Sequence, residues 1–344
     1  MEHVPLGVTG LDIPQLVFGT SCLGNLYEEI SDHTKRAICR EWFAHFPTPI
    51  AIDTAGKYGA GLALEVIGRN LRKMGVPADD VIISNKLGWL RTPLQTPEPT
   101  FEPSVWANLQ HDAEQRISYR GILECWEQGC ELLGPQYRPQ LVSVHDPDEF
   151  LAAAASPEDR RARFDQILEA YRALAELKER GEAAAIGVGA KDWRIIREIE
   201  QFVELDWVML ANSLTVYRHP PELLAWTAAI AAKGVTVINS AVFNAGFLVG
   251  GKYLDYRIPL RDNVDDQRAF EWRDRFMALC TEWDVSPATA CVQYALTCPG
   301  VAAVALNTSS PPKIAENVAA VEAKLPQEFW EVLRDHKLIG PATP

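Results

Sequence analysis

The chain has 344 residues, of which 47% are hydrophobic and 23% charged, a composition typical of a globular protein with a sizeable core. Its formal net charge of −13 argues against a nucleic-acid-binding surface, which needs a basic stripe. No apolar run has the length of a membrane span, and the first residues lack the basic and apolar regions of a signal peptide. The seven cysteines are scattered without a Cys-x-x-Cys motif, so we expect reduced thiols and a cytoplasmic protein with no membrane partner.

Short apolar runs alternate with amphipathic segments along the chain. We expect strands near residues 15–19, 50–53, 81–86, 141–145, 185–189, 207–211, 235–240 and 301–306. We expect helices over residues 34–46, 62–74, 122–133, 161–180, 193–202, 222–233, 268–283, 287–297 and 311–323. Ser286 and Ser310 are the expected N-caps of the last two helices, because a proline follows each of them at the first helical position.

Strands that alternate with helices indicate one parallel sheet. Their number and order predict the α/β fold class, with a (β/α)₈ TIM barrel formed by a single domain over residues 1–344. A doubly wound sheet is the alternative, and it is disfavoured because no Gly-x-Gly-x-x-Gly motif follows the first strand.

Three segments interrupt the alternation: residues 87–119, residues 243–266 and the C-terminal tail, residues 325–344. Segments this long without expected structure are usually functional or disordered. The first two follow the carboxyl ends of strands, so we expect them to shape a substrate pocket at the barrel mouth, and the tail is grouped with them. A short surface helix is expected within residues 146–159.

Polar side chains stand at the ends of the second, third and fourth expected strands. The stretch Ile52-Asp53-Thr54-Ala55-Gly56-Lys57-Tyr58-Gly59 places a carboxylate at a strand end and a tyrosine five residues later, and Lys86 and His145 end the next two strands. Each residue alone has a common structural explanation as a cap, a turn or a solvated charge. In an α/β barrel, however, the strand ends converge on one mouth, and that mouth carries the chemistry.

The four side chains suit proton transfer at a carbonyl or hydroxyl oxygen. A tyrosine pKa of about 10 is lowered by a nearby ammonium group, and a carboxylate holds that ammonium charged. Asp53, Lys86 and Tyr58 are therefore predicted to form a relay, while His145 orients a substrate oxygen.

Several motifs lie at or near the expected strand ends and before the last expected helix. They are Leu16-Val17-Phe18-Gly19-Thr20, the stretch from Ile52 to Gly59, Ser84-Asn85-Lys86, Val144-His145-Asp146-Pro147, Ile186-Gly187-Val188-Gly189, and Ser310-Pro311-Pro312-Lys313 with Glu316-Asn317. Over nearly its full length the chain thereby resembles the aldo-keto reductases. The resemblance implies the (β/α)₈ barrel, a nicotinamide cofactor bound without a Rossmann domain, and a catalytic tetrad of Asp53, Tyr58, Lys86 and His145.

The resemblance also implies the cofactor contacts. These are Gly19, Thr20, Ser21, Ser213, Ser240, Phe243, Asn244, Gly246, Asn307, Thr308, Lys313, Glu316 and Asn317. Where much of the family has a Ser-Asn pair, this chain has Gly189-Ala190. Ser213 stands in place of a glutamine, and Ser240 stands in place of a tyrosine that stacks on the nicotinamide. Asn307 stands at the position of the family's lysine that binds the phosphate of NADP, and Lys313 stands at the position of its arginine. Phosphate recognition needs fixed positive charge, so NAD is expected, with NADP possible.

The run from Gly19 to Tyr27 resembles a branch that oxidises sugars of the L-fucose and L-galactose type at the anomeric carbon, and pyridoxal 4-dehydrogenases are also similar. For this branch the resemblance implies a lactone product, with Tyr58 taking the proton of the C1 hydroxyl. Tyr27, Trp89 and Trp106 are the predicted substrate contacts, joined by Tyr253 and Tyr256 in the second long loop, because aromatic faces stack on sugars.

Other functions stay open on the sequence. A general aldehyde or ketone reductase would use the same tetrad, and a cofactor-binding regulatory subunit would keep the barrel without turnover. A metal-dependent enzyme would draw on His145, Asp146, Asp148 and Glu149, but these are crowded into five residues, so no metal is expected. A small sugar or aldehyde is the expected substrate, and the oligomeric state is undetermined.

Overall fold

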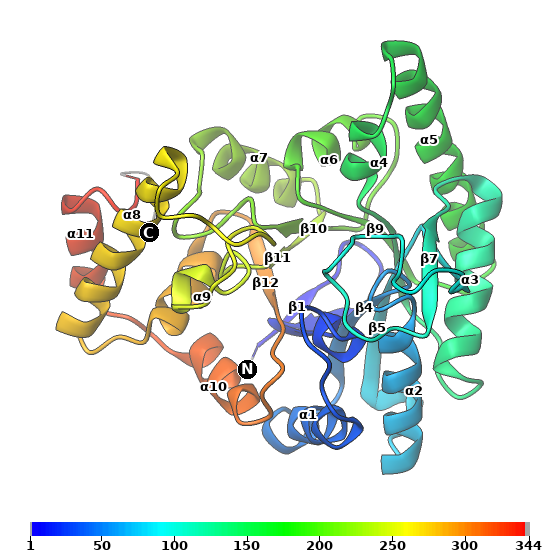
Figure 1. Ribbon diagram of the computed structural model, residues 1–344, viewed down its shortest axis with the longest axis horizontal. Coiled ribbons are helices and arrows are strands. Elements are labelled where there is room, and N and C mark those ends of the chain that lie inside the picture. The colour runs from blue at the N-terminus through cyan, green and yellow to red at the C-terminus, as the bar shows by residue number, and fades with distance from the viewer. Residues whose placement is uncertain (1, 341–344) are drawn as a thin grey trace.

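Eight parallel strands close into a barrel in the computed structural model, which describes residues 2–340 (Figure 1). Around the barrel they are β3 (Leu16–Gly19), β4 (Ile50–Ala55), β5 (Val81–Leu87), β8 (Leu141–His145), β9 (Ala185–Ala190), β10 (Trp207–Ala211), β11 (Thr236–Ser240) and β12 (Val301–Leu306). Closure comes from the pairing of β12 with β3, in which Ala305 lies opposite Val17. The predicted (β/α)₈ barrel is confirmed.

Helices surround the barrel (Figure 1). They are α1 (Asp32–His45), α2 (Leu62–Met74), α3 (Tyr119–Leu133), α4 (Pro147–Ala152), α5 (Pro157–Glu179), α6 (Trp193–Ile199), α7 (Pro221–Ala232), α8 (Val264–Glu282), α9 (Pro287–Thr297), α10 (Lys313–Glu322) and α11 (Gln327–Asp335). The α2 helix shows why they pack in this way, since Leu64, Ile67 and Leu71 recur at helical spacing and are buried. None of the helices within residues 2–340 is both long and apolar enough to cross a bilayer.

A short N-terminal hairpin packs against one end of the barrel. It consists of β1 (His3–Pro5) and β2 (Asp12–Pro14), and its Leu6 and Ile13 share a buried cluster with residues at the starts of the strands, such as Leu141 and Trp207. The amide of Gly7 donates to the Thr236 hydroxyl at the start of β11. This hairpin covers the N-terminal face of the strands, while the predicted catalytic side chains lie at the other face.

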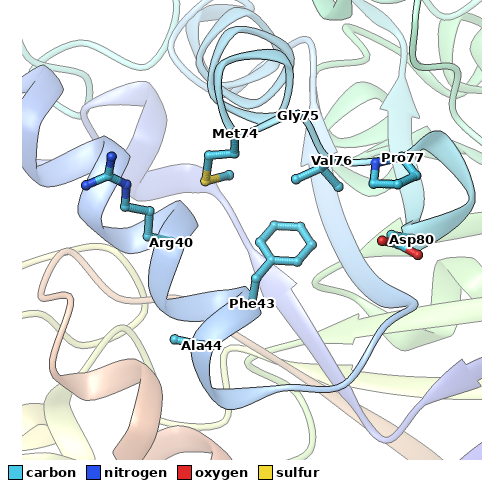
Figure 2. Close-up of a pocket in the computed structure, with 8 residues that line it drawn as sticks. All are labelled: Arg40, Phe43, Ala44, Met74, Gly75, Val76, Pro77 and Asp80. Atoms are coloured by element: carbon cyan, nitrogen blue, oxygen red, sulfur yellow. The ribbon is translucent and has the colours of Figure 1, made fainter.

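A shallow depression of about 450 Å³ also lies at the N-terminal face, between α1, the end of α2 and the short 3₁₀ turn η2 (Ala78–Asp80) that leads into β5. Figure 2 shows Phe43 and Met74 in its middle, with Arg40 and Asp80 at its two sides. It is remote in the fold from the strand ends that carry the predicted tetrad.

The long segments contain more structure than the sequence predicts. Residues 87–119 include an antiparallel hairpin, β6 (Trp89–Pro93) and β7 (His111–Gln115). The tail forms α11, whose Phe329 and Trp330 are buried in the main core, and none of its described residues lines the large cavity at the mouth. The tail is therefore not a substrate loop over residues 325–340, and residues 341–344 lie outside the described part of the chain.

Several helix starts differ from expectation, and those of α5 and α8 do so because a side chain caps the first turn. The α8 helix begins early because the Asn263 side chain accepts from the amides of Asp265 and Asp266, and α5 does so because Ser156 caps it. The α10 helix begins at Lys313, with Pro312 and not Ser310 at the N-cap position. Ser286 precedes α9 as expected, although its side chain makes no capping hydrogen bond. The short helix expected after residue 146 is α4.

Candidate active site

The structure brings the four predicted catalytic side chains to one mouth. Asp53, Lys86 and His145 lie at the ends of β4, β5 and β8, and Tyr58 lies in the turn after β4. The ammonium of Lys86 donates to the Asp53 carboxylate, which also accepts from the Ser84 hydroxyl at 3.2 Å. Lys86 Nζ lies 4.8 Å from the centre of the Tyr58 ring, and the His145 ring lies 5.6 Å from that ring, nearly perpendicular to it.

Gly189, on β9, makes room for this arrangement. A Cβ atom added there would lie 2.8 Å from Cδ of Lys86, closer than real Cβ contacts allow. A larger residue at position 189 would therefore displace the Lys86 side chain, which comes from β5, two strands away in the barrel. In the layer below, a Cβ on Gly187 would meet the Trp207 ring at 2.3 Å.

One cavity of about 990 Å³ extends from the tetrad to the first turns of α9 and α10. It is lined by all of the predicted cofactor contacts except Ser213 and Asn244, namely Gly19, Thr20, Ser21, Ser240, Phe243, Gly246, Asn307, Thr308, Lys313, Glu316 and Asn317. Of the predicted substrate contacts, Tyr27 and Trp106 also line it. A cavity of this size suits a large organic ligand.

Three predicted contacts lie outside the cavity lining. The Asn244 side chain is buried and donates to the Asp255 carboxylate at 2.8 Å, so it braces the loop after β11. Ser213 is buried after β10. Trp89 packs on Phe101, with ring centres 5.9 Å apart, in the cluster behind the cavity wall. These three are corrections to the predicted contact sites.

The cofactor end of the cavity has features that fit a dinucleotide. Asn317 is 8% exposed, lines the cavity, and its amide nitrogen has no hydrogen-bond partner among the described residues. A buried amide donor without a partner is costly, so this nitrogen suits a ligand acceptor such as a nucleobase. Pro287, Ala288 and Thr289 bring the first turn of α9 to the same cavity, where free backbone amides favour an anion.

Burial dominates the protonation of the catalytic pair. The pKa of His145 is held well below its usual range by burial, with Lys86, Lys57 and Lys191 acting in the same direction against Asp146. Burial, helped by Asp53, raises the pKa of Tyr58 well above 10. The lowered Tyr58 pKa that the sequence analysis expects is therefore not found in the protein alone, because burial, with Asp53 acting in the same direction, outweighs it. These directions favour a protonated Tyr58 and a neutral His145 at neutral pH.

Lys57 is a site residue whose role the sequence analysis missed. It is 3% exposed, and its ammonium contacts three carboxylates, Asp146 at 2.7 Å and Glu149 and Glu102 both at 2.8 Å. Its position next to Tyr58 in a glycine-flanked turn was the available signal. The partners come from other loops, and no local pattern pairs them with it.

The same contacts account for the acidic residues that a metal site would need. Asp146 and Glu149 bond to Lys57, and Asp148 accepts from the backbone amides of Lys191 and Asp192. In residues 2–340 no three His, Cys, Asp or Glu side chains are grouped so as to hold a metal ion.

Aromatic rings from separate loops cover the mouth. Tyr27 stacks on Tyr253 with ring centres 3.9 Å apart and planes 9° apart. Trp106 lies 6.0 Å from the Tyr58 ring, and its loop is joined to that of Tyr27 by a 2.7 Å hydrogen bond from the Tyr27 amide to the Val105 carbonyl. Residues of both long segments, 87–119 and 243–266, thus line the cavity, and their role in substrate binding stays a prediction.

Known proteins share this architecture. The chain matches the Aldo/keto reductase family over residues 15–337. It is 28% identical to pyridoxal 4-dehydrogenase of Microbacterium luteolum, over 98% of both chains, and 26% identical to D-threo-aldose 1-dehydrogenase of a Pseudomonas species, over 96% of both. The holo form of an aldo-keto reductase from Bacillus halodurans superimposes with a TM-score of 0.70 at 23% identity, covering 100% of this chain and 98% of the other. The chain belongs to the aldo/keto reductase family, and the protein is an oxidoreductase.

Proposed function

We propose that the protein is an NAD-dependent aldose 1-dehydrogenase that oxidises a sugar of the L-fucose or L-galactose type to its lactone. The observation that carries the proposal is the assembled tetrad, which opens into a pocket of aromatic faces and paired charges. Aromatic faces stack on the apolar side of a pyranose, and charged groups bond its hydroxyls. D-threo-aldose 1-dehydrogenase, similar to this chain along nearly its whole length, supports the same substrate class.

The proposed reaction assigns a task to each member of the tetrad. His145, neutral because it is buried, donates a hydrogen bond to the C1 oxygen and orients it. Tyr58 is the acid/base group, and in the oxidative direction its phenolate takes the proton of the C1 hydroxyl. Asp53 holds Lys86 beside the Tyr58 ring, where the ammonium stabilises the phenolate as it forms. Bound NAD supplies the acceptor for the hydride from C1, which leaves a lactone carbonyl.

Charge at the two ends of the cavity supports an uncharged sugar and NAD. At the substrate end Lys57 and Lys86 are bonded to carboxylates, so neither ammonium is free for an anionic substrate. At the other end the carboxylates of Glu28 and Glu316 line the cavity beside Lys313. This combination disfavours the extra phosphate of NADP, which needs fixed positive charge.

Pyridoxal is a second candidate substrate, favoured by one specific observation. The Tyr27–Tyr253 pair presents flat parallel rings at the mouth, which suit a planar pyridine ring as well as a sugar face. Pyridoxal 4-dehydrogenase, at 28% identity, supports this candidate. The same tetrad would act on the hydroxyl of its cyclic hemiacetal.

Initial rates measured with purified protein test the proposal. NAD and NADP are each paired with L-fucose, L-galactose, their D-enantiomers and pyridoxal, and NADPH is paired with simple aldehydes. We expect NADH formation with an L-fucose or L-galactose type sugar and slower turnover with NADP. Turnover of pyridoxal but of no sugar would make pyridoxal the substrate and leave the proposed roles of the tetrad unchanged. Reduction of simple aldehydes, with no sugar or pyridoxal oxidised, would overturn both.

A further inference from the structure

Lys57 is the most enclosed charged side chain at the mouth that the tetrad does not use. Its ammonium contacts Asp146 after β8, Glu149 in α4 and Glu102 in the β6–β7 loop, so one lysine connects the β4–α2 turn to two other segments. The ammonium also lies 4.9 Å from the centre of the Trp89 ring. Gly56 allows the close approach, because a Cβ there would lie 2.4 Å from the Trp89 carbonyl oxygen.

Two of these carboxylates lead directly to the reaction site. Oδ2 of Asp146, which accepts from Lys57, also lies 3.5 Å from Nε2 of His145. The Glu102 carboxylate contacts Lys57 through one oxygen and accepts from the Trp106 indole nitrogen at 2.8 Å through the other. Trp106 in turn lies beside the Tyr58 ring. The buried ammonium of Lys57 is therefore linked through Asp146 to the His145 imidazole and through Glu102 to Trp106 in the wall of the cavity.

We propose that Lys57 is a positioning residue of this active site, which holds Asp146 against His145 and Glu102 against Trp106. Lys57 balances the charge of Asp146 and engages its Oδ2, so that the imidazole beside this carboxylate stays neutral and keeps its one N–H for a substrate oxygen. The role given to His145 rests on the proposed dehydrogenase reaction, but the placement of Lys57 does not.

The charges around His145 make the balance specific. The charged and titratable groups that face it or bond to its neighbours are Asp146 on its own strand end, Lys57 and Tyr58 in the turn after β4, Asp53 and Lys86 at the ends of β4 and β5, Lys191 after β9, and Glu102 and Glu149. Among these, Asp146 alone is an anion adjacent to the imidazole, and Lys57 is the ammonium bonded to that anion. Without Lys57, only Lys86 and Lys191 oppose the effect of the Asp146 charge on the imidazole.

The direction of the effect follows from these contacts. Burial alone would lower the pKa of Lys57, but the carboxylates outweigh it and raise the pKa, so Lys57 is an ammonium at neutral pH. In Lys57→Met, Asp146 keeps its charge and loses its partner, which favours a proton on the Asp146–His145 pair. An opposite charge within about 4–6 Å shifts the pKa of a titratable group by about one to three units. The imidazole titration should therefore rise by at least about one pH unit.

The test is an NMR titration of the His145 ring in the full-length protein, assigned by its loss in His145→Asn. It requires no turnover, so failure of the sugar assignment leaves it interpretable. We expect His145 to titrate at least about one pH unit higher in Lys57→Met than in the parent protein. Lys57→Arg, which keeps the charge, should stay close to the parent, and Lys57→Met with Asp146→Asn should return the titration toward the parent value.

Lys178→Met is a control at an ion pair remote from His145, although Lys178 is more exposed than Lys57. Lys178 also bonds to a buried aspartate, Asp206, at 2.6 Å, and Asp206 and Asp146 are each 7% exposed in their side chains, but that pair lies at the starts of the strands. The Lys178→Met change should lower the free energy of unfolding without moving the His145 titration. With an active substrate, Lys57→Met should also raise KM and shift the pH profile of kcat/KM, whereas Glu102→Gln should raise KM without the shift. A folded Lys57→Met protein with an unchanged imidazole titration would overturn the proposal.

Discussion

The two ends of the large cavity differ in their buried charges, although His145 Nδ1 and the Tyr27 hydroxyl at the catalytic end also lack a hydrogen-bond partner among the described residues. At the catalytic end the buried charges have partners within the chain, as Lys86 has in Asp53 and Lys57 has in three carboxylates. At the cofactor end the Asn317 amide nitrogen has no partner among residues 2–340, and Ser286 leaves the first turn of α9 without a side-chain cap. The catalytic end is thus preorganised for chemistry, while the other end has donors left for a ligand.

Removing the acid/base group should break the catalytic end and leave the cofactor end intact. Tyr58→Phe deletes the phenol that carries the transferred proton, so kcat should fall by about 10²–10⁴-fold. Titration with NAD, followed by protein fluorescence, should give an unchanged dissociation constant. Tyr217→Phe, which deletes a phenol outside the cavity lining, is the control. A Tyr58→Phe protein with near-normal kcat would show that this tyrosine is not the acid/base group.

Displacing Lys86 tests how far the catalytic end depends on exact placement. In Gly189→Ala the new Cβ meets Cδ of Lys86 and moves the ammonium relative to Asp53 and Tyr58. Misplacement of this order costs roughly 10- to 100-fold in kcat. The matched change, Gly187→Ala, meets the Trp207 ring away from the tetrad and should instead lower the free energy of unfolding by about 1–3 kcal/mol. Thermal melts and kcat measured on both variants separate the two effects, and equal losses of kcat would contradict this account.

The pH dependence of oxidation should reflect the enclosed tyrosine. Burial raises the pKa of Tyr58, so the phenolate is a small fraction at neutral pH, and that fraction grows with pH until the raised pKa is reached. The rate of sugar oxidation should accordingly rise by about tenfold per pH unit in this range, while reduction, which uses the phenol, should not rise. Initial rates in both directions between neutral and alkaline pH test this. An oxidation rate that falls with pH would be inconsistent with Tyr58 as the base.

The smallest effect is expected at the cofactor end. Asn317→Ala removes one hydrogen-bond donor to the ligand, which is worth about 0.5–1.5 kcal/mol, so KM for NAD should rise by about twofold to twelvefold with kcat unchanged. Asn70→Ala, at a buried asparagine outside the cavity whose amide bonds within α2, is the control for loss of a buried amide. Loss of kcat with unchanged KM in Asn317→Ala would place this residue elsewhere in the mechanism.

Much of the fold was predictable because the barrel strands are short, buried and separated by helices. The bounds of β8, β10 and β12 match the expected ranges, since each is a nearly continuous apolar run. The β6–β7 hairpin was missed because Trp89 pairs with Gln115 across a long proline-containing loop, and such pairing is set by tertiary contacts. The α11 helix was missed, although Phe329, Trp330 and Leu333 recur at helical spacing and give it an apolar face.

The tetrad was predictable for a topological reason, since parallel strands bring their ends together whatever the side chains do. The contacts of the individual side chains were not. Lys57 bonds to carboxylates in two other segments, and Asn244 turns away from the cavity to bond to Asp255. The raised pKa of Tyr58 depends on burial and on the nearby charge of Asp53, which the sequence does not display.

The most direct test of the central claim is to follow the hydrogen on the anomeric carbon. L-fucose or L-galactose that carries deuterium at C1 is incubated with the protein and NAD, and the reduced cofactor and the sugar product are analysed by mass spectrometry. This account predicts deuterium in the NADH together with formation of the lactone, and loss of both in Tyr58→Phe. Unlabelled NADH, or a sugar recovered unchanged while pyridoxal or aldehydes turn over, would contradict it.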